Sequence, residues 1–312
     1  MQTTVRTSVS CAGTGLHCGE QVNMQLHPAP AGTGIIFRRI DLLTCNSLDA
    51  QAASLHQVSI KASPANVAGT QLGTSLVNDH GIEISTVEHL MAAFAGYGVD
   101  NVIVEVDNAE LPIMDGSAEP FLKLIERAGL RQLNSPKFAL RIKEKISVQD
   151  GDRWAYALPL DEDEVPGFNI DVLVDYIDPA IGKQRASMTV TPAEFQANVA
   201  PARTFCYLSD VEAMRARGLA LGGSYDNAIV VNNGQIENEG GLRLSNEFAS
   251  HKALDLLGDL YLLGMPLQGR VTAFKPGHDM NTRLARAILD NPDKVELVSV
   301  SNADAESVRA QA

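Results

Sequence analysis

The 312 residues of this chain exceed what a single compact core usually holds, so we expect two domains of ordinary size. The content of 45% hydrophobic and 20% charged residues is typical of a soluble globular protein, and no window approaches the 18 apolar residues of a membrane-spanning helix. The formal charge of −13, with no basic face visible, argues against nucleic-acid binding but permits a small anionic ligand held by local cations such as Lys252, Lys275 and Arg203.

The beginning of the chain and its cysteines indicate the cellular compartment. The first ten residues, MQTTVRTSVS, lack the charged and apolar regions of a signal peptide, so we expect a cytoplasmic protein. Cys11, Cys18, Cys45 and Cys206 form no CxxC pair and no regular framework. This usage suits free thiols in a reducing compartment, and we expect no disulfide.

The first third of the chain predicts short strands, including Gln21 to Leu26 and Gly34 to Arg38, between glycine-rich turns. The segment from Gly13 to Gly19 resembles a dinucleotide-binding loop only superficially, because that fingerprint needs a glycine where Cys18 stands and a full strand before it. We therefore reject a dinucleotide-binding loop here. His17 is a polar side chain in this turn, although a lone loop histidine is usually just solvated.

The segment from Ile84 to Gly96 predicts a helix with two candidate functional residues, Glu88 and His89, near its start. Ser85 suits the N-cap, Glu88 completes a capping box, and Gly96 suits the C-cap. A second interpretation of Glu88 is chemical, because a carboxylate beside His89, a potential metal ligand, could reach a metal-bound water. The segment by itself leaves both interpretations open.

The next elements lead to the predicted domain boundary. They are a strand from Asp100 to Val106, a turn from Leu111 to Ser117, a helix from Glu119 to Ala128, and a new β-like run from Phe138 to Val148. Asn134-Ser135-Pro136, a sequence typical of a turn or loop, separates the helix from the β-like run. We therefore expect an N-terminal domain of residues 1–132 and a C-terminal domain of residues 133–312.

Residues 161–231 predict an exposed acidic turn, a strand and a small insert. The turn is Asp161 to Glu164, and Tyr176 follows the strand from Asn169 to Val174, where its ring could simply cover the core. A helix from Leu208 to Arg217, followed by a glycine turn and a strand, predicts a βαβ insert at about 200–231. The insert is either decoration or a passage for an apolar ligand, lined by Leu208, Val211, Leu219 and Leu221.

The segment from Ser245 to Gly264 predicts a long helix with apolar residues on most sides, which is the pattern of a buried helix. His251, Asp255 and Asp259 stand at i, i+4 and i+8 and form one ridge, with Lys252 beside it. An unpaired buried carboxylate costs several kcal/mol, so these groups need a metal, a cation or hydrogen bonds. A metal held by the first two and a buried His–Asp hydrogen bond are both compatible with the spacing.

The end of the chain offers one further candidate. A strand from Val271 to Phe274 leads into Lys275-Pro276-Gly277-His278, which places His278 on a tight turn where loops often carry catalytic groups. A solvated loop histidine is the alternative. We expect a last helix near Met280 to Leu289 and a polar, frayed tail from Ser301 to Ala312.

Eight motifs follow one another along nearly the whole chain. They are Gly15-Leu16-His17, Ile84-Ser85-Thr86-Val87-Glu88-His89-Leu90, Gly98-Val99-Asp100-Asn101, Pro112-Ile113-Met114-Asp115-Gly116-Ser117, Ala202-Arg203-Thr204-Phe205, Leu221-Gly222-Gly223-Ser224, His251-Lys252-x-Leu254-Asp255 and Gly277-His278. This ordered set resembles the bacterial UDP-3-O-acyl-N-acetylglucosamine deacetylase family, the zinc enzymes of the committed step in lipid A synthesis. The resemblance implies an α+β fold of two domains, each a sheet packed on helices, with the helices sandwiched between the two sheets and a small βαβ insert in the second domain.

The resemblance also implies the catalytic groups. One Zn2+ per chain would be held by His89, His251 and Asp255 with a fourth position for water, although Fe2+ also suits two histidines and a carboxylate. Glu88 would take a proton from this water as it attacks the acetamide of the sugar. His278, oriented by Asp259, would protonate the departing amine, and the Thr204 hydroxyl would stabilise the oxyanion.

The substrate implied by the resemblance is a UDP-acyl-aminosugar. Lys252 would pair with its phosphates, Tyr176 would stack near the uracil with Phe205 beside the site, and His17 would lie near the head of the substrate. The residues of the acyl passage would be Leu208, Val211, Leu219 and Ala220. We expect a monomer without an integral membrane segment and with at most transient contact with a membrane surface. The chain has no cysteine between Gly69 and Ser75, where some relatives carry one.

Two other functions compete with this interpretation. A zinc peptidase or another amidohydrolase would share the metal ligands but not the acyl insert, and a comparison of deacetylation with peptide cleavage separates them. A nucleotide-sugar binding module would carry His251 and Asp255 as a structural pair. Metal analysis, with loss and recovery of activity on chelation and refilling, separates this binding module from an enzyme.

Overall fold

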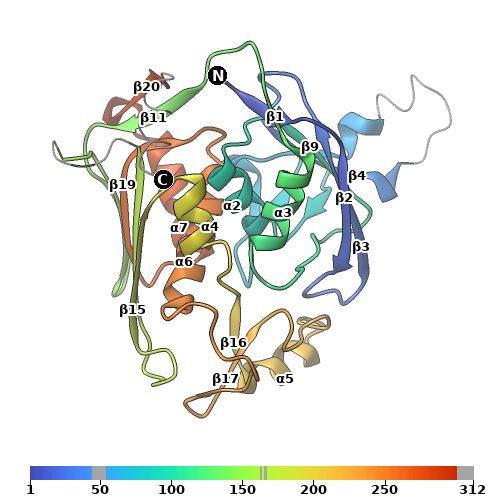
Figure 1. The fold of residues 1–312 in the computed structure, drawn as a ribbon, viewed down its shortest axis with the longest axis vertical. Helices are drawn as coiled ribbons and strands as arrows, with labels where there is room; N and C mark the ends of the chain where they lie inside the picture. The colour runs from blue at the N-terminus through green and yellow to red at the C-terminus, as the bar shows by residue number, and fades with distance from the viewer. Residues whose placement is uncertain (44–53, 162–163, 165–166, 301–312) are drawn as a thin grey trace.

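Two β-sheets enclose layers of helices, and a smaller lobe lies beside them (Figure 1). The computed structural model describes residues 1–43, 54–161, 164 and 167–300. Cys45, Glu162 and Asp163 of the predicted acidic turn, and the predicted tail 301–312 lie outside the described residues. Among the described cysteines, Cys11, Cys18 and Cys206 are free thiols.

The N-terminal sheet has five strands in the order β2-β3-β9-β4-β5. Their bounds are β2 (Val9–Thr14), β3 (Gln21–Pro28), β4 (Ile35–Arg39), β5 (Ser59–Lys61) and β9 (Val102–Val106). In β3 the residues Val22, Met24 and Leu26 are buried while those between them are exposed, so one face of the sheet covers the core and the other meets solvent. The three strands predicted in this part of the chain are confirmed.

Smaller strands and turns complete the first half. Their bounds are β1 (Thr3–Val5), which pairs with β10 (Leu130–Gln132), the meander β6 (Val67–Gly69), β7 (Ser75–Val77) and β8 (Glu83–Ile84), and the short 3-10 turns η1 (Ile40–Leu42) and η2 (Pro64–Asn66). The connection between β6 and β7 reaches the helices, because Thr74 in this connection contacts Glu88 of the helix that starts there and Asp259 of the later buried helix.

The second sheet has seven strands around β19 (Leu267–Phe274). Its other strands are β11 (Phe138–Ile142), β12 (Ile146–Asp150), β13 (Arg153–Leu158), β14 (Phe168–Asp175), β15 (Lys183–Thr189) and β20 (Val295–Ser299), and η3 (Pro292–Lys294) precedes the last strand. β19 runs parallel to β14 and antiparallel to β13. The β-like run predicted from Phe138 to Val148 is therefore two strands, β11 and β12.

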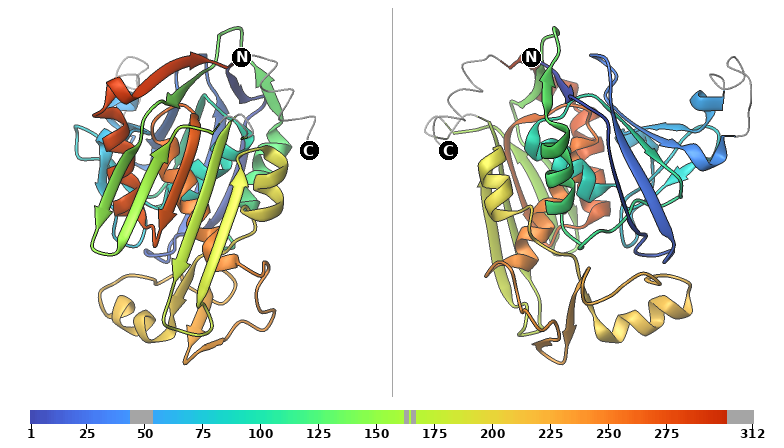
Figure 2. Two further views of the ribbon diagram at one scale, coloured as in Figure 1. Left: turned by 90° about the vertical axis from the view of Figure 1, so that its left-hand side faces the viewer. Right: turned by 45° about the vertical axis from the view of Figure 1, so that its right-hand side comes forward.

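The helices fill the space between the sheets, as Figures 1 and 2 show. They are α2 (Glu88–Tyr97), α3 (Glu119–Ala128), α6 (Glu247–Tyr261) and α7 (His278–Leu289), with α4 (Pro192–Asn198) between β15 and α2. In α6 every residue except Lys252 is buried, which confirms the prediction of a buried helix. The α+β fold with helices between two sheets is confirmed, and one continuous apolar core includes residues from both halves. The boundary near residue 133 stays a prediction.

A glycine sets the distance between α2 and α6. A Cβ atom at Gly258, in the middle of α6, would lie 2.0 Å from the carbonyl oxygen of Glu88 and 3.1 Å from the amide nitrogen of Ala92. Glycine in a helix interior costs about 1 kcal/mol relative to alanine. Here it allows the two helix backbones to touch. The first turn of α2 therefore packs against the face of α6 that carries His251, Asp255 and Asp259.

The predicted ends of two helices are wrong. α2 begins at Glu88 after Val87 and has no side-chain cap, so the capping box is wrong; the hydroxyl of Ser85 instead donates to the Ala109 carbonyl. Thr86 has a φ of 60°, which turns the chain before the helix starts. The C-cap is Gly98, with a φ of 73°, rather than Gly96. α7 begins at His278, two residues before the predicted start, so His278 is the first residue of a helix.

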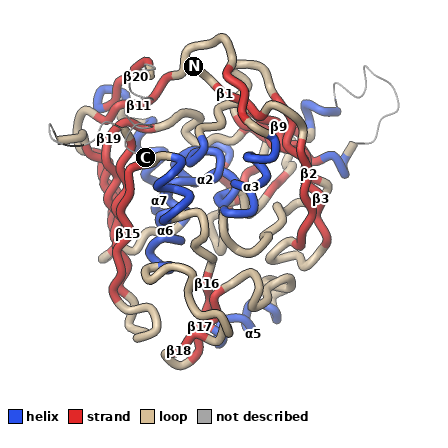
Figure 3. Tube along the Cα trace, viewed as in Figure 1, coloured by secondary structure: helices blue, strands red, loops and turns tan. Residues whose placement is uncertain are grey.

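The insert is a separate lobe below the sheets (Figures 1 and 3). β16 (Phe205–Tyr207), α5 (Leu208–Ala216) and β17 (Ile229–Asn232) form the predicted βαβ unit with parallel strands, and β18 (Gln235–Ile236) extends its sheet. No residue of α5 is buried. No helix among the described residues has the length and apolar character needed to cross a membrane.

Candidate active site

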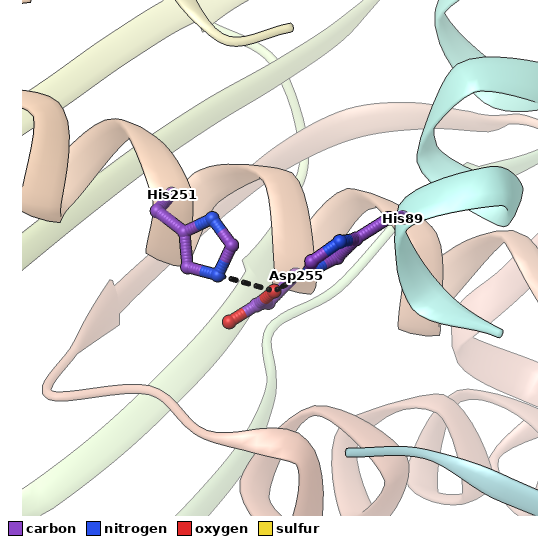
Figure 4. Close-up of side chains that lie close together, drawn as sticks. All are labelled: His89, His251 and Asp255. Carbon is purple, nitrogen blue, oxygen red and sulfur yellow. Dashed lines mark ion pairs between the residues drawn. The ribbon is translucent and has the colours of Figure 1, made fainter. Parts of the chain in front are cut away.

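Three side chains that the sequence singled out converge between α2 and α6 (Figure 4). Nε2 of His251 lies 3.4 Å and Nε2 of His89 lies 3.7 Å from Oδ1 of Asp255. The two imidazole rings have centroids 5.0 Å apart and are nearly perpendicular, at 87°. One ligand atom from each of the three residues lies within 4.8 Å of the others, and all three residues are buried.

This cluster fits a divalent metal ion. Oδ1 of Asp255 is buried and has no hydrogen-bond partner among the described residues. A tetrahedral ion with bonds of about 2.0 to 2.1 Å holds its ligand atoms roughly 3.3 Å apart, close to the separations seen here. Two imidazole nitrogens and one carboxylate oxygen also form the ligand set of catalytic zinc sites, which keep a further position open.

Neighbouring groups orient the ligands. Nδ1 of His251 lies 3.1 Å from the Ala202 carbonyl oxygen, and because it donates there, Nε2 is left to face Asp255. Nζ of Lys252 donates to Oδ2 of Asp255 at 2.9 Å. Oδ1 of Asp255 is therefore the oxygen left for a metal.

The protonation states agree with metal binding. Burial, helped by the charge of His251, lowers the pKa of His89 to about 3, and burial also lowers the pKa of His251. Burial acts to raise the pKa of Asp255, but His251 and Lys252 outweigh it and hold the pKa well below its usual range. The histidines are thus neutral and the aspartate is ionised, which are the forms that bind metals.

Glu88 lies beside this cluster as the first residue of α2 and is only 3% exposed. Its Oε2 accepts a hydrogen bond from the Thr74 amide at 2.9 Å. Burial raises the pKa of Glu88 to about 7, and the opposing charge of His278 is too weak to prevent it. A carboxylate with this pKa can both take and release a proton near neutral pH.

His278, which is partly buried, and the buried Asp259 form a pair whose charges act on Glu88. Nδ1 of His278 lies 3.0 Å from Oδ2 of Asp259, which is fully buried. Burial acts to lower the pKa of His278, but the charge of Asp259 outweighs it and the pKa is raised to about 9. His278 is therefore protonated at neutral pH and can donate a proton.

Aromatic rings and a cation border the cluster. The Phe205 ring lies 5.8 Å from the Tyr176 ring and 6.2 Å from the His251 ring, centroid to centroid. Nζ of Lys252 lies 5.4 Å from the Phe205 centroid. Thr204 is half-buried between Ala202 and Phe205 in sequence, and its hydroxyl makes no hydrogen bond within the part of the chain that the structure describes. Phe205, Tyr176 and Lys252 are thus placed together beside the cluster.

The other two cations suggested by the sequence pair with carboxylates outside the cluster. Arg203 is buried, and its Nε lies 2.9 Å from Oε1 of Glu247 in an ion pair. Its Nη2 also donates to the Gly241 carbonyl, so the pair joins both ends of the insert to the start of α6. Lys275 pairs with the exposed Asp152. Lys252 is therefore the cation of these three that borders the cluster.

The glycine-rich turn near the N-terminus binds an internal carboxylate. Glu110, 3% exposed, accepts hydrogen bonds from the amides of His17 at 2.8 Å and Cys18 at 2.9 Å, and from the Thr86 hydroxyl at 3.2 Å. The turn's amides are thus satisfied inside the protein, in agreement with the rejected dinucleotide site. A single glutamate after a strand gave no sequence signal for this role.

The ring of His17 connects this turn to two other loops. Its Nε2 lies 3.3 Å from the Leu72 carbonyl oxygen, and its Nδ1 lies 3.4 Å from the Ala220 amide. Of the four residues predicted for an acyl passage, Ala220 is buried, Val211 and Leu219 are half-buried, and Leu208 is exposed. Ala220 and His17 are therefore neighbours, as the sequence could not show.

Sequence reasoning also missed two partners of Asp259. Nδ2 of Asn281 donates to Oδ2 of Asp259 at 2.8 Å, and the Thr74 hydroxyl donates to Oδ1 at 2.6 Å. The i, i+3 spacing of His278 and Asn281 on one helix was an available signal for the first. Thr74 lies in a loop without a pattern, so its position depends on the tertiary fold.

The α+β frame and this centre define a class of protein, a hydrolase that can hold a metal ion beside a carboxylic acid and a histidine of opposite protonation. Residues 2–290 match the family model of UDP-3-O-acyl N-acetylglycosamine deacetylase, and the chain belongs to this family of amide-cleaving enzymes.

Three relatives are similar over nearly their full length, and each is named UDP-3-O-acyl-N-acetylglucosamine deacetylase. The protein of Colwellia psychrerythraea is 45% identical over 300 residues, which cover 96% of this chain and 93% of the relative. That of Vibrio parahaemolyticus is 45% identical over 297 residues, covering 95% and 92%. That of Sodalis glossinidius is 45% identical over 300 residues, covering 96% and 93%.

Proposed function

We propose that this chain hydrolyses the N-acetyl group of UDP-3-O-(3-hydroxyacyl)-N-acetylglucosamine and releases acetate, the committed step of lipid A synthesis. Family membership and the names of the relatives support the substrate. The observation that carries the proposal is the convergence of His89, His251 and Asp255 beside Glu88. We propose a cytoplasmic monomer with domains of residues 1–132 and 133–312.

The metal of the proposal is Zn2+, one per chain, held by Nε2 of His89, Nε2 of His251 and Oδ1 of Asp255. When bound, zinc supplies a Lewis acid that lowers the pKa of water toward about 7 and polarises an amide carbonyl. Fe2+ suits the same ligands. Lys252 supports the set because its hydrogen bond to Oδ2 of Asp255 fixes which oxygen is free.

Glu88 is the general base of the proposal. Its Oε2 is held by the Thr74 amide, so Oε1 takes the proton from the attacking water. His278 is the general acid, because Asp259 holds its Nδ1 and leaves the Nε2 proton for the departing amine. The Thr204 hydroxyl donates to the oxyanion that develops at the amide carbonyl.

The substrate contacts of the proposal follow the layout of the groups around the centre. Lys252 pairs with the phosphates, Tyr176 and Phe205 contact the uracil end, and His17 lies near the head of the substrate. The acyl chain runs along the insert past Leu208, Val211, Leu219 and Ala220. The exposed apolar side chains of Leu208 and Leu221 support an apolar ligand there.

The test combines metal analysis with an acetate-release assay on UDP-3-O-acyl-N-acetylglucosamine. Protein purified without added metal should contain about one zinc or iron ion per chain, lose activity on chelation and regain it on refilling. Near-stoichiometric metal without acetate release would instead support a nucleotide-sugar binding module. Peptide cleavage without deacetylation would support another amidohydrolase.

A further inference from the structure

Thr74 connects the two proton-carrying groups of the centre. It lies in the connection between β6 and β7 and is fully buried. Its amide donates to Oε2 of Glu88 at 2.9 Å, and its hydroxyl donates to Oδ1 of Asp259 at 2.6 Å. Its carbonyl oxygen accepts from the Val87 amide at 3.3 Å, which fixes the threonine at the start of α2.

The hydroxyl completes the surroundings of Asp259. Oδ2 of this carboxylate takes hydrogen bonds from Nδ1 of His278 at 3.0 Å and from Nδ2 of Asn281 at 2.8 Å, while Oδ1 takes the Thr74 hydroxyl. Asp259 is fully buried, so water cannot replace a lost donor without a rearrangement. Without the donor on Oδ1, the carboxylate is held through Oδ2 alone, and a rotation about these remaining bonds changes the direction of the His278 ring.

The amide holds the other group. Because Oε2 of Glu88 is bonded to the Thr74 amide, the carboxylate cannot turn, and Oε1 has no hydrogen-bond partner within the described residues. The Cβ that a side chain at Gly73 would add lies 3.3 Å from Oε1, so the neighbouring glycine keeps the space beside this oxygen open.

We infer that Thr74 is a positioning residue, whose amide aims Glu88 at the reacting water and whose hydroxyl keeps Asp259 aligned to hold His278 toward the leaving amine. This inference rests on the proposed function. Thr74 does not touch the substrate and acts through the two groups it bonds. It also gives a role to the loop between Gly69 and Ser75, for which the sequence offered none.

Substitution removes the hydroxyl bond to Asp259 without removing the amide bond to Glu88, since any residue except proline keeps the amide. Thr74→Val has nearly the shape of threonine but no hydroxyl, and Thr74→Ser keeps the hydroxyl. We expect the valine variant to lower kcat about tenfold to a hundredfold, as a misaligned catalytic group does, with KM within threefold and metal content unchanged. The serine variant should keep kcat within threefold of the wild-type value.

Thr282 provides the matched control. It is a buried threonine on α7 whose hydroxyl has no hydrogen-bond partner in the described parts of the chain. Thr282→Val should therefore leave kcat within twofold. If Thr74→Val does not fold, as thermal denaturation and metal content would reveal, Thr74→Ala removes the hydroxyl without filling its place and should show the same loss of kcat.

A second comparison tests whether Thr74 acts through His278. In a His278→Ala background, Thr74→Val should lower the residual kcat by less than threefold, because the group that the hydroxyl serves is already gone. An equal loss in both backgrounds, or a hydroxyl-free variant with kcat within threefold of wild type, overturns the inference. A wild-type enzyme that releases no acetate refutes the proposed function instead, so the two failures are distinct.

Discussion

At the scale of single residues, one buried environment produces two opposite ionisation states. Burial disfavours charge on both Glu88 and His278, and it raises the pKa of Glu88 to about 7. For His278 the adjacent Asp259 carboxylate outweighs burial and raises the pKa to about 9. A base and an acid with pKa values on this order suit a reaction near neutral pH.

The pH dependence of the reaction follows from these signs. In the proposed mechanism Glu88 acts as a base only above its pKa, and His278 acts as an acid only below its pKa. We expect kcat/KM to rise toward about pH 7 and to fall above about pH 9, and a bound divalent cation moves the first limb to lower pH. A pH–rate profile of metal-loaded enzyme measures both limbs, and a rate that keeps rising beyond pH 10 would contradict the role of His278.

Removal of the base tests Glu88 directly. In Glu88→Gln the amide cannot take a proton, so kcat should fall about 10²- to 10⁴-fold while metal content stays near the wild-type value. Glu83→Gln, an exposed change on β8, is the matched control and should leave kcat unchanged. If Glu88→Gln and His278→Ala both kept rates within tenfold of wild type, the assignment of acid and base would be wrong.

At the scale of elements, periodicity predicted α6 and its His–Asp ridge well, because a helix fixes i, i+4 neighbours by local geometry. The sequence did not show that α2 faces this ridge, since Gly258 creates that contact through space. The capping box at Ser85 failed because the positive φ of Thr86 ends the extended segment before the helix. Thr74 and Glu110 act across loops far apart in sequence, which no local pattern records.

The contact at Gly258 can be tested by adding one methyl group. In Gly258→Ala the new Cβ meets backbone of α2 at 2.0 Å, so the helices must separate. We expect a loss of about 3 kcal/mol or more in the free energy of unfolding and reduced metal content, because His89 moves away from Asp255. Calorimetry and metal analysis measure both effects.

Gly240→Ala is the control for this change, since nothing lies within 4 Å of a Cβ there. A Gly258→Ala protein with wild-type stability and full metal content would show that the helices do not depend on this close approach.

The proposed acyl passage in the insert can be tested through the acyl-length preference of the enzyme. Ala220→Leu enlarges a buried side chain beside His17, so we expect a shift toward shorter acyl chains without a change in metal content. Relative kcat/KM values for substrates of different acyl length measure the shift. The same change at the exposed Ala213 on α5 should have no effect, and an unchanged preference in Ala220→Leu would place the acyl chain elsewhere.

At the scale of the whole molecule, the cluster joins helices from the two halves of the chain. His89 belongs to the half with the five-stranded sheet, and His251 and Asp255 belong to the half with the seven-stranded sheet. An ion bound between them stabilises the folded protein because the unfolded chain offers no such site. In the proposed function, the three side chains that hold the metal for catalysis therefore also add a link between the halves, beside the apolar core that both share.

Chelation should expose this dependence. A ligand present at 100 times its Kd adds about 2.7 kcal/mol to the free energy of unfolding, so metal removal should lower the Tm by several degrees and refilling should restore it. His251→Ala, which lacks a ligand, should show little response to the chelator. A wild-type Tm that does not change on complete metal removal would mean that the ion does not hold the halves together.

The buried pair of Arg203 and Glu247 has an evolutionary consequence. Loss of either partner leaves an unpaired charge in the interior and costs about 3 to 5 kcal/mol, so a change at one position alone is strongly disfavoured. Across homologous genes the two positions should change together or stay fixed. The pair also holds the segment around Ala202, whose carbonyl oxygen orients His251. We therefore expect Arg203 and Glu247 to be substituted less often than the residues of the insert.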